Sequence, residues 1–468
     1  MSRILIITTE FIRFEGSPTG GRGVRTGNLA DGLRKNGHTV FFSFPKDNYE
    51  KLKTKPPSSL TQYLHNYYYD EIIKEINPEI IIFSPWTLML SLKNDAIINN
   101  YFIGADLPGP LVIENSFQNN EDDFIFASKK IVSLNKADFF LCSNERQKYY
   151  IMPWLLLSGH SLTENNIIIT PISSDLNDKV PNCYPSVPEY IFGGVLWPWQ
   201  NYGENLKNIA EFLAKNRGIL KTFCGSFIYE KKNEKLSCLD KYETVKQFEL
   251  INHEDLITQY KSSSAAIELY CMNNERILAN TTRTLEYFAN GLPVIYSKNM
   301  FFSDIIQEYN AGWVIDPENQ DDLFEVLKEI NSNPMICAEK GENAKKIIKE
   351  KFHNRESTKY LSDYCNSPFK TKKTNNYFSL TSSAMLNQSE AIAGFLNSIA
   401  DMKIELNEKQ EIILKTEKVI LEKSYRMNEA NEKINFLENE NRFLTDDLNR
   451  IKSRIIFKIL LKLKKIFY

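Results

Sequence analysis

Two series of short apolar runs most strongly limit the folds open to this sequence. The first series comprises Ile4–Ile7, Thr39–Phe42, Glu79–Phe83, Leu111–Ile113, Asp138–Leu141 and Ile167–Ile169. Longer stretches with the apolar spacing of helices separate these β-branched and aromatic runs. Continuous apolar strands that alternate with helices predict a parallel sheet covered on both faces. We therefore expect residues 1–175 to form a doubly wound α/β domain.

The second series follows Ser173–Pro188, a stretch rich in Pro, Asn, Asp and Ser that is typical of a connection between domains. Its runs are Tyr190–Phe192, Leu220–Phe223, Ala265–Ile267, Pro293–Tyr296 and Trp313–Ile315. They predict a second Rossmann-like domain over residues 189–365, and 468 residues are too many for a single core. Two such domains in tandem predict a ligand-binding cleft at the C-terminal ends of their strands.

The alternation stops after residue 365. We expect residues 366–397 to form a linker and connecting helix, and residues 398–452 to form a coiled coil. The coiled coil is predicted by a column of residues spaced seven apart: Ile399, Leu406, Ile413, Ile420, Met427, Ile434, Asn441 and Leu448. The second column, three residues further on, is weaker because it contains Lys409 and Lys423. Self-association is the favoured reading, and a solvated helix that folds back on the rest of the chain is the alternative.

The segment 450–468 concentrates positive charge at one end of a chain whose net charge is -2. It holds seven Lys and Arg residues and no acid, interleaved with Ile, Leu, Phe and Tyr. A cationic amphipathic segment of this length predicts a helix that lies in the surface of an anionic membrane. The alternative is a continuation of the coiled coil. Neither a secretory signal nor a spanning helix is expected from the sequence.

The seven cysteines are scattered and form no CxxC pair, which predicts a reducing cytoplasm rather than disulfides or a zinc site. The glycine-rich stretch Gly16–Gly23 lies between the first predicted strand and a predicted helix, where its N–H groups are available to a phosphate or sugar. Its spacing fits neither the dinucleotide fingerprint nor a Walker loop. We place His38 in the next helix-to-strand turn, with a catalytic role as the alternative.

The segment Glu275–Ile295 contains the strongest chemical signal. Thr281 or Thr282 is suited to cap a short helix that Gly291 ends, and Pro293 opens the next buried strand. The N-terminus of such a helix, with Arg283 beside it, suits a diphosphate. Glu286 lies one turn further on, where its carboxylate is able to accept hydrogen bonds from ribose hydroxyls. The alternative for Glu286 is ordinary charge matching in the first turns of a helix.

Three motifs in this order, "ADFFLCSNERQKYY" (137–150), "GGVLWPWQ" (193–200) and "ERILANTTRTLEYFANGLPVI" (275–295), resemble family 4 glycosyltransferases. The resemblance extends over about residues 1–360 and is nearest to a bacterial subgroup tied to O-antigen, capsule and other surface polysaccharides. It implies a GT-B fold that uses a nucleotide-sugar without an obligatory metal or cofactor, with retention of anomeric configuration. It also implies a lipid-linked or growing polysaccharide as acceptor, and no nucleic-acid partner. The sequence agrees about the metal, because it contains no convincing DxD pair.

The resemblance also implies roles for individual residues. Glu286 binds the ribose, Glu275 contacts the sugar, and Thr282 and Arg283 belong to the donor site. Glu275 and Arg283 are also the candidate catalytic residues. Gly20 and Gly21 approach the donor phosphates, while Gly193 and Gly194 line the opposite wall. Trp197–Gln200 stands where the family has an Arg and Lys pair, so phosphate charge is expected from Arg283, or from Arg22 and Arg25 across the cleft. Glu275 stands eleven residues before Glu286, whereas the family spacing is eight.

Two further features bear on the acceptor side and on rival functions. Glu145 begins a predicted helix beside the cleft, where it either orients an acceptor hydroxyl or merely caps the helix. The favoured function is thus a cytoplasmic glycosyltransferase, peripheral on the inner membrane. The alternatives are a nucleotide-sugar epimerase on the same fold and a catalytically silent scaffold in a polysaccharide-assembly complex.

Overall fold

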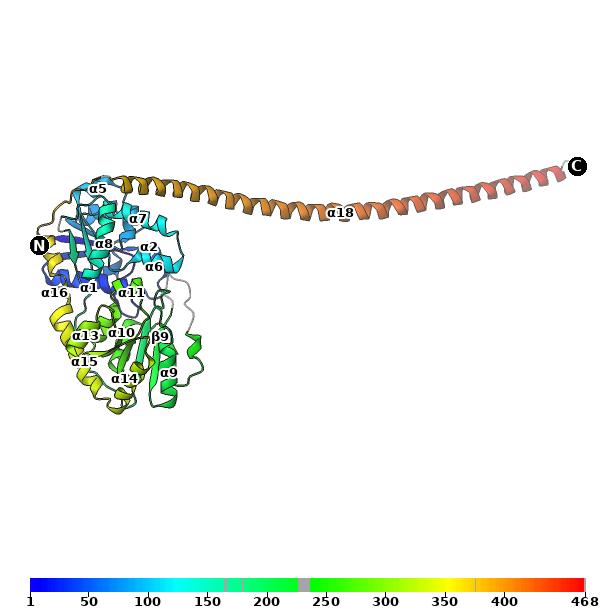
Figure 1. The fold of residues 1–468 in the computed structure, drawn as a ribbon. Coiled ribbons are helices and arrows are strands. Elements are labelled where there is room, and N and C mark those ends of the chain that lie inside the picture. The colour runs from blue at the N-terminus through cyan, green and yellow to red at the C-terminus, as the bar shows by residue number, and fades with distance from the viewer. Residues whose placement is uncertain (164–165, 179–180, 226–235, 375, 467–468) are drawn as a thin grey trace. The chain divides into compact units, whose positions relative to one another are not determined.

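The computed structural model describes residues 1–468 except 164–165, 179–180, 226–235, 375 and 467–468. The chain divides into two compact units, residues 1–386 and 387–468. The first unit contains two α/β domains, each built on a parallel sheet (Figure 1). This arrangement confirms the predicted fold class.

The first sheet has seven strands in the order β3-β2-β1-β4-β5-β6-β7. Its strands are β1 Arg3–Thr8, β2 Thr39–Pro45, β3 Leu64–His65, β4 Ile80–Ser84, β5 Phe102–Asp106, β6 Phe139–Cys142 and β7 Ile167–Ile169. The connecting helices are α1 Gly21–Lys35, α2 Lys46–Lys51, α3 Ser58–Thr61, α4 Asp70–Ile76, η1 Trp86–Ser91, α5 Asp95–Asn100, α6 Leu111–Gln118, α7 Asp123–Asn135 and α8 Glu145–Leu157. Alternate residues of β1 enter separate cores, Ile4 and Ile6 on one face and Leu5 and Ile7 on the other. Helices therefore cover both faces of the sheet, as its continuous apolar strands predict.

The prediction of a strand at Leu111–Ile113 is wrong. These three residues are half-buried and begin helix α6, directly after Pro110. Proline has no N–H to give to a sheet ladder but is well tolerated where a helix begins. The strand in this part of the chain is β5, where Gly104 lies so close to β6 that a Cβ would come within 2.3 Å of the Phe139 ring.

The second sheet has six strands in the order β10-β9-β8-β11-β12-β13. Its strands are β8 Glu189–Gly194, β9 Ile219–Cys224, β10 Val245–Phe248, β11 Ala265–Glu268, β12 Val294–Ser297 and β13 Gly312–Ile315. The helices are α9 Asn205–Lys215, η2 Ser237–Leu239, α10 His253–Lys261, α11 Asn274–Leu278, α12 Thr282–Ala289, α13 Ser303–Tyr309, α14 Gln320–Ser332, α15 Ile336–Ile347 and η3 Ile348–Phe352. All five strand runs predicted for this domain fall on strands. The prediction did not include β10, whose residues alternate between half-buried and exposed and form no apolar run.

After the second sheet the chain returns to the first domain. Helices α16 Asn354–Ser357 and α17 Lys359–Asn366 pack against α1, and Leu361 and Tyr364 enter the core of the first domain. Asp138 then holds the next segment by ion pairs of 2.9 Å to Lys370 and 3.0 Å to Lys373. The sequence pattern alone places Leu361 in the second domain. It indicates that a residue is buried, but it does not indicate which domain's core the residue enters.

Helix α18 runs from Tyr377 to Ile466 and makes up the described part of the second unit. The apolar side chains of the heptad column are exposed in the single chain, for example Ile413 at 56% and Ile420 at 61%. Among the described residues, none of the helices is both long and apolar enough to cross a membrane.

Candidate functional site

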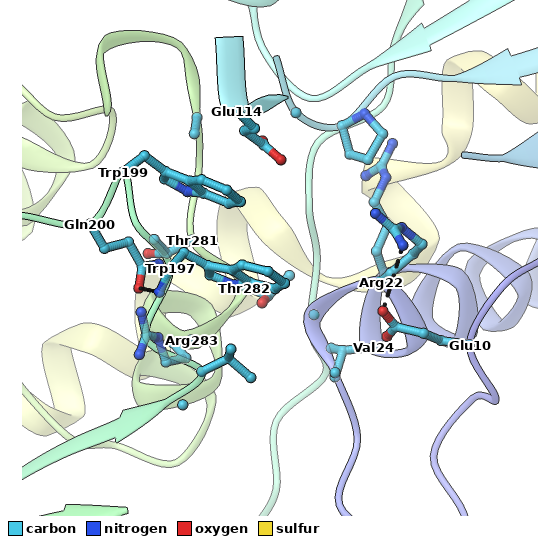
Figure 2. A pocket seen from close by; sticks show the side chains of 18 of the residues that line it. Glu10, Arg22, Val24, Glu114, Trp197, Trp199, Gln200, Thr281, Thr282 and Arg283 are labelled. Carbon is cyan, nitrogen blue, oxygen red and sulfur yellow. Dashed lines mark hydrogen bonds and ion pairs between the residues drawn. The ribbon is translucent and has the colours of Figure 1, made fainter. Parts of the chain in front are cut away.

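A cavity of about 740 Å³ lies between the two α/β domains. One wall comes from the first domain, with Glu10 after β1, the start of α1 and helix α6. The other wall comes from the second domain, with the loop after β8, helix α11 and the start of α12 (Figure 2). The cavity therefore occupies the interdomain position that the tandem sheets predict.

Helix α1 presents its N-terminus to the cavity with a cap already in place. The Oε2 atom of Glu10 accepts a hydrogen bond of 3.0 Å from the N–H of Gly23, in the first turn. Arg22 lies with Nη1 3.7 Å from Oε1 of the same carboxylate. Gly20 is the N-cap, and Gly21 is close enough to the second domain that a Cβ there would lie 3.0 Å from Oγ1 of Thr282. The glycines thus allow the two walls to approach each other.

Helix α12 presents its N-terminus to the same cavity without a side-chain cap. Thr281 is the N-cap residue, but its hydroxyl bonds to the hydroxyl of Thr284 rather than to a backbone N–H. Thr281 and Thr282 both line the cavity. The free N–H groups and the dipole of this helix make its first turn suitable for an anion.

Glu286, on the second turn of α12, connects the two walls. Its Oε1 atom lies 2.6 Å from Nε2 of His253 at the start of α10, and 2.9 Å from Nη2 of Arg13 in the β1–α1 loop. Burial alone raises the pKa of Glu286, but the His253 hydrogen bond and the charge of Arg13 outweigh this and hold it below its usual value. The carboxylate therefore stays charged at neutral pH. Its Oε2 atom accepts no hydrogen bond from the described residues.

Arg283 faces inward, toward its own domain. Its guanidinium donates to the carbonyl of Gly193 and, over 2.8 Å, to the hydroxyl of Tyr270, and its Nε lies 3.2 Å from the buried Glu268. Gly194 has φ +112°, and a Cβ there would lie 2.7 Å from Nη1 of Arg283. Arg283 thus fixes the loop after β8, and the glycine makes room for it.

Glu275, at the start of α11, forms a buried ion pair with its neighbour Arg276. Burial raises the pKa of Glu275, although the Arg276 charge opposes the shift. The guanidinium of Arg276 also lies 5.4 Å from the centre of the Tyr270 ring. Both residues line the cavity, so Glu275 presents a carboxylate whose charge is already compensated.

Among the described residues, no three His, Cys, Asp or Glu side chains are grouped so as to hold a metal ion. Residues 174–347 match the family model described as glycosyl transferases group 1. This part of the chain is a glycosyltransferase group 1 domain. No curated protein sequence matches it.

The glycosyltransferase shares its fold with several solved structures. Sucrose-phosphate synthase from Thermosynechococcus elongatus is 14% identical, with a TM-score of 0.53 over 84% of this chain and 100% of that one. A variant of S. aureus TarM, in complex with fondaparinux, α-GlcNAc-glycerol and UDP, is 10% identical, with a TM-score of 0.56 over 78% of this chain and 100% of that one. Anabaena HepE in complex with UDP-glucose is 11% identical, with a TM-score of 0.55 over 78% of this chain and 100% of that one. These likenesses confirm the GT-B arrangement of two Rossmann-like domains.

The structure brings together most of the residues that the sequence places at the site of this glycosyltransferase. The cavity-lining residues include Gly20, Gly21, Gly194, Glu275, Thr282, Arg283 and Glu286. Gly193 lies behind them and contributes its carbonyl to Arg283. Arg25 is tied to Asp106 by a buried ion pair of 2.8 Å, so its charge is directed into the first domain.

Glu145 lies apart from this group. Its side chain is 62% exposed, lies 3.7 Å from Lys148, and is absent from the residues that line the cavity. The neighbouring Asn144 and Arg146 instead connect α8 to the second domain, through Asn280 at 2.5 Å and the carbonyl of Asn299 at 3.0 Å. His38 is buried in the turn after α1, where Nε2 lies 2.9 Å from the hydroxyl of Ser362.

Three residues at the site were not predicted from the sequence: His253 and Glu114, which line the cavity, and Arg13, which contacts Glu286. Arg13 is in a loop without a motif. His253 follows Asn252, which caps α10, and this Asn-His-Glu-Asp start is a signal for a helix N-terminus but not for a ligand site. Glu114 was not predicted because the sequence pattern places a strand, rather than the start of helix α6, at Leu111–Ile113. The rings of Trp197 and Trp199 also line the cavity and are stacked on each other, with their centroids 4.9 Å apart.

Proposed function

We propose that this enzyme transfers a sugar from a nucleotide-sugar, held at the N-terminus of α12, to a hydroxyl group that enters from the first domain. The uncapped first turn of α12 at the cavity is the observation that carries the proposal. The solved structures of TarM and HepE contain UDP or UDP-glucose, which supports the same ligand class here.

The geometry of this wall supports the following proposal for the donor contacts. The diphosphate accepts hydrogen bonds from the N–H groups of Thr282 and Arg283, and the ribose hydroxyls donate to Oε2 of Glu286. His253 and Arg13 keep that carboxylate charged and fixed. Arg283 acts by holding Gly193 and Gly194 in place as the wall of the donor site. Glu275, with its charge balanced by Arg276, contacts the hydroxyls of the transferred sugar.

The chemistry needs the leaving diphosphate to be stabilised as the bond between sugar and phosphate breaks. The free N–H groups and dipole of α12 supply that stabilisation where charge develops. We further propose that the anomeric configuration is retained. This is tested by NMR of the product anomer at early reaction times, and an inverted product would contradict it.

We propose a lipid-linked or growing surface polysaccharide as acceptor and a peripheral position on the inner membrane. The support is the segment 450–468, which has seven cations, and apolar side chains such as Ile455 and Phe457 that are 51% and 65% exposed in the single chain. Such a segment binds an anionic surface through charge and apolar area together. Full-length protein is expected to sediment with anionic but not with neutral vesicles, and K458E/K462E/K464E is expected to stay in solution. Equal sedimentation of both proteins would contradict the proposal.

We also propose that α18 self-associates through its heptad column. The exposed side chains of Ile413 and Ile420 are the apolar surface that such a coiled coil covers. Light scattering of the full chain is expected to give an oligomer, and I413D/I420D is expected to give a monomer. A wild-type monomer at micromolar concentration would contradict self-association.

The thermal-shift experiment for the main proposal uses the full chain with UDP, GDP, dTDP and CMP. One nucleotide is expected to raise the melting temperature, because a ligand at about 100 times its Kd adds about 2.7 kcal/mol to stability. Glu286→Ala is expected to lose the shift, measured against its own unliganded melting temperature, while the exposed Glu145→Ala keeps it. No shift with any nucleotide would favour the silent scaffold. A shift accompanied by epimerised nucleotide-sugar, without transfer, would favour the epimerase.

A further inference from the structure

Glu114 differs from the other carboxylates that line the cavity. Four of them are engaged: Glu10 by the N–H of Gly23, Glu121 by Lys129, Glu275 by Arg276, and Glu286 by His253 and Arg13. Among the described residues, none forms a hydrogen bond or an ion pair with the side-chain carboxyl group of Glu114. A half-buried carboxyl group without a partner calls for an explanation, because burial of such a group is otherwise costly.

The local structure directs this carboxyl group into the cavity. Glu114 lies in the first turn of α6, after the Pro108–Pro110 turn. A Cβ on Gly109 would lie 2.8 Å from Oε1 of Glu114, so the glycine gives the carboxyl group the room it occupies. Figure 2 shows the group pointing into the cavity beside Trp199. It therefore belongs to the first-domain wall, which is opposite the start of α12.

The charges around Glu114 determine its protonation. Burial and the negative charge of Glu275 raise the pKa of Glu114 to about 8, and Arg22 and Arg276 oppose this rise only in part. Tyr150 of α8 is also within electrostatic range. The charged side chains of the adjacent α7 and its preceding loop are Lys129, paired with Glu121, and Lys130, which lies over the Tyr150 ring. Two acids complete this set: Asp122 caps α7, and Asp123 accepts hydrogen bonds from Asn115 and Ser116 of α6. A carboxyl group in this range exchanges a proton near neutral pH, which suits general acid–base work.

We propose that Glu114 is a catalytic residue that receives the proton of the acceptor hydroxyl during sugar transfer. The inference rests on the proposed function. The acceptor oxygen forms a bond to the anomeric carbon, and its proton passes to a carboxylate oxygen of Glu114. The bond between the anomeric carbon and the phosphate oxygen breaks, and its electron pair leaves with the nucleoside diphosphate at α12. Glu114 then returns the proton to solvent.

The first experiment measures the protonation of Glu114 without any assay of activity. A folded-state pKa above the unfolded one means that the folded chain holds a proton that the unfolded chain releases, between about pH 4.3 and 8. Wild type is therefore expected to lose stability relative to Glu114→Gln as pH rises through this window, and to lose no more above it. Parallel melting curves of the two proteins from pH 4.5 to 8.5 would overturn the raised pKa and the role that depends on it.

The second experiment measures turnover of the nucleotide-sugar that stabilises the chain, with water as acceptor. The rate of wild type is expected to rise with pH up to about 8, because the base must be ionised. Glu114→Gln is expected to lower kcat about 100-fold, to remove this rise, and to leave the nucleotide thermal shift intact. Glu114→Asp is expected to recover part of the rate, and Glu145→Gln, at an exposed position outside the cavity, serves as the control with an unchanged rate.

The outcomes separate the two levels of the account. If wild type binds nucleotide and Glu114→Gln turns over at the wild-type rate with the same pH profile, this inference is overturned and the proposed function stands. If wild type binds no nucleotide, the proposed function fails and this inference fails with it.

Discussion

Helices α1 and α12 point their N-termini at the same cavity from opposite domains, yet their first turns differ. In α1 the Glu10 carboxylate already accepts the N–H of Gly23, so an anion at this end has to compete with a resident negative charge. In α12 the Thr281 hydroxyl is taken up by Thr284, and the backbone N–H groups have no side-chain cap. Two helix ends with the same dipole thus differ in what they offer to a phosphate.

The difference assigns separate tasks to the two walls. The second domain keeps an open helix end and a charged carboxylate, Glu286, whose position is fixed from both domains. The first domain contributes close approach through Gly21, and the carboxyl group of Glu114, which has no partner among the described residues. We therefore expect changes on the α12 side to affect nucleotide binding, and changes on the α1 side to affect fit and stability.

The largest effect is expected from Glu286→Ala. The change removes the proposed ribose contact and leaves His253 and Arg13 without their common partner. We expect kcat/KM for the nucleotide-sugar to fall at least about 100-fold, or about 2.7 kcal/mol of transition-state stabilisation. Steady-state kinetics against donor concentration measure this. A fall of less than about threefold would remove Glu286 from the donor site.

A smaller effect is expected where the two helix ends meet. Gly21→Ala places a Cβ 3.0 Å from Oγ1 of Thr282, which forces the walls apart by a few tenths of an ångström. We expect a loss of activity of about tenfold, because misplacement of this kind mainly affects reaction geometry. Gly27→Ala, on the same helix, meets nothing closer than 3.4 Å and is the matched control. Equal activities of the two variants would show that the close contact does not matter.

Removing the Glu10 cap tests whether the N-terminus of α1, like that of α12, is able to receive the phosphates. Glu10→Ala leaves the N–H of Gly23 without its partner and is expected to lower the free energy of unfolding by about 1 kcal/mol. Nucleotide affinity is expected to change by less than about threefold, because the diphosphate is assigned to α12. Urea denaturation and calorimetric titration measure the two quantities. A large gain in nucleotide affinity would show that α1 also receives the phosphates.

The smallest effect is expected from Glu145→Ala. Its 62% exposed side chain has only Lys148 nearby, at 3.7 Å, and exposed pairs of this kind contribute little. Activity and melting temperature are expected to stay within error of wild type. A strong loss of transfer to the natural acceptor, with donor turnover in water unchanged, would return Glu145 to the acceptor site.

The sequence predicts the parts of the fold that local patterns encode. Runs such as Ile80–Ser84 and Val294–Ser297 are continuous and apolar because both faces of their sheets are covered. Strand β5 lacks that signal, because Gly104 replaces a β-branched residue where the Phe139 ring leaves no room. Pattern alone also does not show that α17 crosses back to the first domain, since that depends on packing between distant segments.

The candidate site also contains residues that local patterns in the sequence predict and residues that only tertiary packing brings together. Thr282, Arg283 and Glu286 lie on one short helix whose start and end are visible in the sequence. Arg13 and His253 lie 273 and 33 residues from Glu286, and only the folded chain brings them to its carboxylate. The inward turn of Arg283 toward Glu268 likewise depends on tertiary packing, because Glu268 carries no motif and is fully buried at the end of β11.

Amide hydrogen exchange of the full chain, with and without the nucleoside diphosphate that stabilises it, tests the division of tasks most directly. Bound nucleotide is expected to slow exchange in the first turn of α12, Thr282–Thr284, at least about tenfold, while exchange in the first turn of α1, Arg22–Val24, changes much less. Strong protection of α1 without protection of α12, under conditions where binding is saturated, would contradict the account.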